Sequence, residues 1–134
     1  MPKSPIRAVF ANRLRAARTA LGVSQAELGA RVGIPEDVAS TRVNRYERGV
    51  HDPDLATAEA LADELGIPLP ALVARDDGMA MLIAGFAALS QAKQKAMLAQ
   101  LETALGAKKA EEVRAQLDQA TLSDGSPTRK PRRL

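Results

Sequence analysis

Apolar residues recur every three or four positions along most of the chain, the spacing that places side chains on one face of an α-helix. The first series, at Phe10, Leu14, Ala17 and Leu21, predicts a helix that begins near residue 5 or 6 and ends at Gly22. Series of this kind, separated by Gly and Pro, predict an all-α fold.

Residues 24–49 predict two short helices joined by a tight turn. Ser24 and Glu27 have the spacing of a capping box, which begins a helix. Gly33 can provide the left-handed stop, and Pro35 suits the first turn of the next helix. The inward positions of that second helix are Val38, Ala39, Val43 and Tyr46. Such a pair is a helix-turn-helix, a unit used to place its second helix in the DNA major groove.

The rest of the chain predicts more helices and a polar end. An apolar series from Leu55 to Leu65 ends at Gly66, and Pro70 opens a fifth short helix. We therefore assign residues 1–75 to one five-helix domain. Residues 76–121 carry further apolar series that include Met81, Leu98 and Leu117, and form a helical extension. Residues 122–134 are polar and basic, which predicts a disordered tail able to touch phosphate or to act as a solubilising segment.

Several short motifs, in order, carry a family resemblance. SQAELGARVG (24–33) followed by NRYERG (44–49) is similar to the Xre or lambda-repressor-like helix-turn-helix family. The likeness extends to LRAARTALGVSQ (14–25) and PDLATAEALADELGIPLPAL (53–72), so it covers roughly the first 75 residues. It implies a five-helix lambda-repressor-like DNA-binding domain followed by the C-terminal helical extension.

The sequence departs from the family pattern in two places. Eleven residues separate Gly33 from Arg45, where the family usually has about seven. The excess of about four is one helical turn, so either the recognition helix is longer at its start or an irregular turn precedes it. Glu36 and Asp37 lie in this insertion, and we interpret them as capping residues held away from the duplex. Gly29 stands where the family often has Ala.

The resemblance also implies roles for individual residues. Arg18 would pair with Glu47, and Gln25 would position a phosphate. The outward residues of the second helix that would face base edges are Ser40, Thr41, Arg42, Asn44 and Arg45. Arginine matches guanine O6 and N7, and asparagine can read adenine. We favour Thr41 and Arg45, which share a face, together with Ser40. The expected phosphate contacts are Arg13, Ser24, Gln25 and Arg48.

Composition narrows the chemistry. Hydrophobic residues make up 46% of the chain and aromatic residues only 2%, so the core must be aliphatic, which suits closely packed helices. There is no cysteine, and His51, the single histidine, lies in a loop, so we expect neither disulfides nor a metal site. No Gly-rich phosphate loop or cysteine nucleophile is present. We therefore expect no cofactor and no enzymatic activity.

Positive charge is concentrated where the helix-turn-helix is predicted. Residues 1–48 contain nine Lys or Arg and four Asp or Glu, a net charge of +5, whereas the whole chain has +3. The tail adds four basic residues and one acid, a further +3. A basic surface that coincides with a DNA-binding motif favours double-stranded nucleic acid as partner.

We therefore expect a sequence-specific transcriptional regulator of the repressor type that acts as a homodimer through residues 76–121. Packing of this extension onto its own domain is left open. The alternative function is an antitoxin or protein-interaction adaptor whose C-terminal helices bind a partner protein. The longest uncharged stretch, residues 78–92, is too short to span a membrane comfortably, and no signal peptide is visible, so we expect a cytoplasmic location. The operator and any small-molecule effector stay open.

Overall fold

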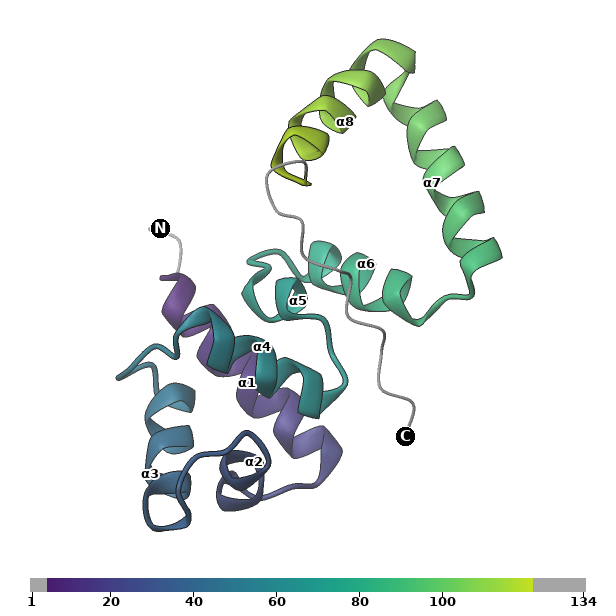
Figure 1. The fold of residues 1–134 in the computed structure, drawn as a ribbon. Helices are drawn as coiled ribbons and strands as arrows, with labels where there is room; N and C mark the ends of the chain where they lie inside the picture. The colour runs from purple at the N-terminus through teal and green to yellow at the C-terminus, as the bar shows by residue number, and fades with distance from the viewer. Residues whose placement is uncertain (1–4, 122–134) are drawn as a thin grey trace. The chain divides into compact units, whose positions relative to one another are not determined.

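The computed structural model describes residues 5–121 (Figure 1). These residues form eight helices and no strand, which confirms the all-α prediction. The helices are α1 (Ile6–Leu21), α2 (Gln25–Arg31), α3 (Glu36–Glu47), α4 (Leu55–Leu65), α5 (Leu69–Val73), α6 (Asp77–Ala88), α7 (Gln91–Leu105) and α8 (Ala107–Thr121). Contacts between residues divide the chain into two units, residues 1–89 and 90–134.

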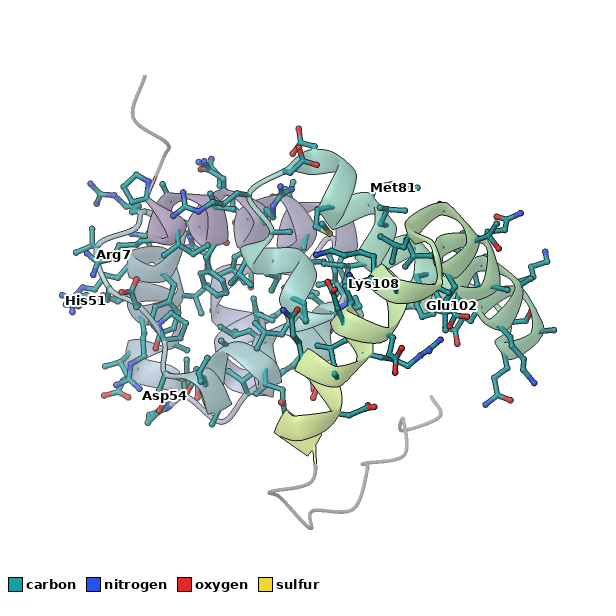
Figure 2. All side chains as sticks on the ribbon, turned by 90° about the horizontal axis from the view of Figure 1, so that it is seen from above. Arg7, His51, Asp54, Met81, Glu102 and Lys108 are labelled. Carbon is teal, nitrogen blue, oxygen red and sulfur yellow. The ribbon has the colours of Figure 1, made fainter. Side chains whose placement is uncertain are left out.

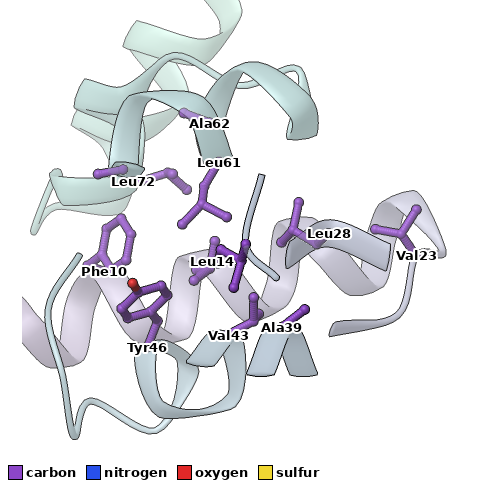
Figure 3. Close-up of a cluster of buried hydrophobic side chains, with 12 residues drawn as sticks. Phe10, Leu14, Val23, Leu28, Ala39, Val43, Tyr46, Leu61, Ala62 and Leu72 are labelled. Atoms are coloured by element: carbon purple, nitrogen blue, oxygen red, sulfur yellow. The ribbon is translucent and has the colours of Figure 1, made fainter. Parts of the chain in front are cut away.

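The core of the first unit is aliphatic and draws on each of its first five helices. Each helix contributes one of the largest fully buried side chains, which Figure 3 labels: Leu14 of α1, Leu28 of α2, Val43 of α3, Leu61 of α4 and Leu72 of α5. The aromatic rings of Phe10 and Tyr46 complete the cluster. Five short helices therefore bury a common set of Leu and Val side chains, as the low aromatic content predicts.

Local signals set the ends of the first helices. The Ser24 hydroxyl accepts a hydrogen bond from the backbone N–H of Glu27 at 3.0 Å, as the capping-box spacing predicts. Gly33 has a φ of +86°, in the left-handed region where a side chain is strained. The chain can therefore reverse between α2 and α3, which lie side by side in Figure 1.

The insertion lies within α3. Only Ile34 and Pro35 separate Gly33 from the first residue of the helix, and no irregular turn intervenes. Glu36 and Asp37 occupy the first turn and are exposed. Acidic side chains are favourable there because the N-terminus of a helix carries partial positive charge. Of the two possibilities left open by the spacing, the structure shows the longer helix.

Helix α6 is grouped with the first unit, which ends at Leu89. Asp76 caps α6 by accepting from the N–H of Met79 at 2.8 Å. Arg13 of α1 donates to the carbonyl oxygen of Ala74 at 2.9 Å and to Asp77 Oδ1 at 3.1 Å. The start of α6 and the residues before it are thus attached to α1.

The second unit consists of α7 and α8, joined at Gly106. Ser90 caps α7 by accepting from the N–H of Lys93, and Arg114 of α8 forms an ion pair with Glu102 of α7. Among the side chains that the structure describes in this unit, only Ala110 is buried. The predicted basic tail, residues 122–134, lies outside the described residues.

Candidate nucleic-acid interface

Helix α3 has one face in the core and one face in solvent. Ala39, Val43 and Tyr46 are buried on the first face. The predicted base-contacting residues Ser40, Thr41, Arg42 and Arg45 are all exposed. Thr41 and Arg45 are four residues apart and so lie on the same side of the helix. The structure therefore brings four of the five predicted base-contacting side chains to an accessible surface.

Asn44, the fifth, lies between α3 and α2. It is half-buried, and its Oδ1 accepts a hydrogen bond from Gln25 Nε2 at 3.3 Å. The family resemblance placed Asn44 among the outward residues that would face base edges. The side chain is instead turned toward α2, since adjacent residues of a helix point about 100° apart.

A buried carboxylate joins the three helices of this region. Glu47 of α3 is 8% exposed. Its Oε1 accepts from Arg18 Nε, and its Oε2 accepts from Arg18 Nη2 at 3.3 Å and from Gln25 Nε2 at 2.6 Å. Arg18 also donates to the carbonyl oxygen of Val23 at 2.9 Å. A buried charge is tolerated only when it is paired and hydrogen-bonded, and this network fixes the orientation of α3 against α1 and α2.

The predicted phosphate-contacting residues fall into two groups. Ser24 and Arg48 are exposed at the start of α2 and the end of α3. Gln25 and Arg13 have protein partners: both donations shown for Gln25 go to α3, and the Arg13 guanidinium is directed to Ala74 and Asp77. The Arg13 side chain is only 23% exposed. Arg13 therefore anchors the start of α6 to α1, a role that the sequence did not indicate.

The loop after α3 adds side chains that the sequence did not single out. Arg7 Nε donates to Asp52 Oδ1 at 2.8 Å, and Arg7 Nη2 donates to Oδ2 at 2.9 Å. Hydrogen bonding and then the charge of Asp52 raise the pKa of Arg7 above its ordinary value. His51 lies at the same end of the unit (Figure 2). No local signal pairs residues 7 and 52, because they are 45 positions apart.

A hollow of about 440 Å³ connects this loop to α3. The exposed residues Thr41, Arg42 and Arg45 contribute one wall, and His51 and Asp52 contribute the other. Val38 and Tyr46 line the rest. The exposed face of α3 is therefore continuous with the loop, and two arginines and a histidine border the same depression.

Within residues 5–121, no group of three or more His, Asp or Glu side chains could hold a metal ion. None of the helices described here is long and apolar enough to cross a membrane.

Comparison with known proteins supports the helix-turn-helix arrangement of α2 and α3. A helix-turn-helix family model matches residues 14–72. The solved structure entitled "Crystal structure of transcriptional regulator BswR" is similar to this chain, with 39% sequence identity and a TM-score of 0.67. The match covers 72% of this chain and 96% of that chain. A search of curated proteins found no match. The present chain is thus a member of the Xre, or lambda-repressor-like, family of helix-turn-helix proteins.

Proposed function

We propose that this protein is a sequence-specific transcriptional regulator that inserts α3 into the major groove of DNA. The observation that carries the proposal is the exposed polar face of α3, formed by Ser40, Thr41, Arg42 and Arg45. The opposite face is buried and Glu47 fixes the helix in place. A rigid helix that presents arginines outward matches the way this fold class reads base edges.

The side chains take different parts in the proposed complex. Arg42 and Arg45 provide the forked donors that match guanine, with Thr41 and Ser40 beside them. Ser24 and Arg48 flank α3 and contact phosphates. Gln25 and Asn44 are joined by a hydrogen bond, so we propose that they act as one unit at the groove edge. Arg13 is omitted from the DNA contacts because its guanidinium is used within the protein.

We further propose that the protein acts as a homodimer. Two copies of α3 would read two half-sites about 34 Å apart, one turn of the duplex. The second unit supports self-association. Its described residues include Leu98, Leu101 and Leu117, which are 47%, 53% and 64% exposed. Two helices with so little buried apolar surface need a partner surface to be stable.

The test is DNA binding as a function of salt. We expect the purified full-length protein to bind a fragment of its own upstream region more tightly than random DNA of equal length. Fluorescence anisotropy at several salt concentrations would separate the contribution of phosphate contacts from that of base contacts. Phosphate contacts weaken steeply as the salt concentration rises, whereas base contacts maintain the higher affinity for the specific fragment. Equal affinity for both fragments at every salt concentration would contradict sequence-specific recognition.

The exposed apolar side chains of α7 and α8 also suit a second function, that of an antitoxin or adaptor which binds a partner protein. The two proposals differ in the stoichiometry they predict. A regulator on its own forms a complex that contains only this chain and DNA. An antitoxin co-purifies in a fixed ratio with a second protein, which pull-down from the native host followed by mass spectrometry would detect.

A further inference from the structure

Helix α6 is apolar around its whole circumference, yet none of its residues is buried. From Gly78 to Ala88 it contains only Gly, Ala, Met, Leu, Ile and Phe. Met79, Met81 and Leu82 are 53%, 72% and 58% exposed. A helix that is apolar on all sides is normally buried. The exposed surface of α6 is therefore the feature of the first unit that DNA binding leaves unexplained.

Helix α6 is attached to its unit at its N-terminal end and along one side. Asp76 caps its first turn, and Arg13 of α1 joins Ala74 and Asp77 at its start. Helix α5 packs against it. These contacts use the N-terminal end and one side of α6, and they leave Met81 (Figure 2) and Leu82 outward.

We infer that α6 is the centre of a twofold interface with a second copy of this chain, in which α6 packs against α6. The inference rests on the proposed homodimer and names its surface. Charge favours this occupant. A twofold interface places the same residues of both copies opposite each other, so a charged helix would repel itself. Between residues 78 and 88 α6 has no charge, and the one acid in its first turn, Asp77, is paired with Arg13.

The C-terminal tail is a poor alternative occupant. Residues 122–134 contain four basic residues, two prolines and only two leucines, one at each end. Such a segment cannot bury a helix that exposes two methionines and a leucine, because its apolar content is too small. Coverage of α6 by α7 and α8 of the same chain is the remaining possibility, and it predicts a monomer.

Sedimentation velocity of the full-length protein at several concentrations tests the inference. We expect the unchanged protein to sediment as a dimer. Met81→Lys should weaken dimerisation at least about tenfold, because it places a charge in the apolar centre of the interface. The matched control is Leu55→Lys on α4. Leu55 is 81% exposed, against 72% for Met81, and its replacement should have no effect on the dimer.

A mixing experiment tests the pairing of α6 with α6. Met81→Lys and Met81→Glu should each be monomeric alone, and equimolar mixing should restore a dimer that contains one of each. Circular dichroism melting would show that each variant is folded. A dimer that persists in both variants would overturn the α6 interface while leaving the homodimer intact.

A monomeric unchanged protein would overturn both the α6 interface and the homodimer. Binding to a DNA fragment that carries a single half-site tests DNA recognition separately from dimerisation. This binding depends on α3, so the affinity of the Met81 variants for the fragment should be within about twofold of that of the unchanged protein.

Discussion

Gly29 of α2 lies directly against Ala39 of α3. A Cβ atom built on Gly29 would stand 2.8 Å from Ala39 Cβ, closer than Cβ atoms approach other atoms in proteins, and 3.1 Å from Ala39 Cα, which is an unusually tight contact. The two helices can therefore pack at this distance only because residue 29 has no side chain. The Gly that the sequence shows in place of the more usual Ala is explained by the contact it makes.

Gly29→Ala should consequently destabilise the protein, although alanine is the better helix former. Overpacking typically costs about 1–3 kcal/mol, and helix propensity returns up to about 1 kcal/mol. Urea unfolding followed by circular dichroism would measure the net loss. In the Ala39→Gly background the same substitution should cost less, because the clashing methyl group is absent. An identical effect in both backgrounds would show that the contact is not limiting.

Arg45→Ala should weaken binding to the preferred DNA site by about 1–3 kcal/mol and reduce the preference for that site over random DNA. Arg15→Ala removes the same charge from an exposed position on α1 and serves as the control. Anisotropy titrations with both fragments would compare the two variants. If Arg45→Ala loses the same affinity on specific and random DNA, Arg45 contacts phosphate and not a base.

Glu47→Ala should lower the free energy of unfolding by about 3–5 kcal/mol, because it leaves the largely buried Arg18 without its partner. The two side chains are 3% and 16% exposed, so solvent cannot replace the lost contact. Glu47→Gln keeps the shape and an accepting oxygen and should cost less. Chemical unfolding measures both variants, and a loss below about 1 kcal/mol for Glu47→Ala would mean that the pair is replaceable.

The stability of the protein should depend on the ionisation of Asp54 at acid pH. This carboxylate caps α4, accepting from the N–H of Thr57 at 2.7 Å. Hydrogen bonding from the Thr57 side chain, and then from its backbone, lowers the pKa of Asp54 below the ordinary value of 3.8. The folded state therefore binds this proton less readily, so the contribution is complete above the ordinary pKa and is lost as the pH falls through the lower folded-state value.

Asp54→Asn provides the matched variant, because asparagine can cap a helix without titrating. The stability difference between the original protein and this variant should be constant from neutral pH to about pH 5 and should change below about pH 4. Thermal melts across this range would measure it. A difference that is unchanged down to pH 2 would show that Asp54 does not titrate in a way that is linked to folding.

The sequence by itself determined the all-α fold and several of the helix ends. Ser24 with Glu27, Gly33 and Gly66 act within three or four residues, so their spacing is enough to place a cap or a stop. The apolar periodicity likewise identified the buried face of α3, and with it the exposure of Thr41 and Arg45. The family resemblance added the pairing of Arg18 with Glu47, which no local pattern contains.

The tertiary structure alone decided which distant residues meet. Arg13 joins Asp77 across 64 positions, and this contact holds the start of α6 against α1. The turn of Asn44 toward Gln25 and the contact of Gly29 with Ala39 depend on how two helices are rotated against each other. Side-chain spacing along one helix carries no information about that rotation. It is set by packing the whole core at once, and so these features had to be seen in three dimensions.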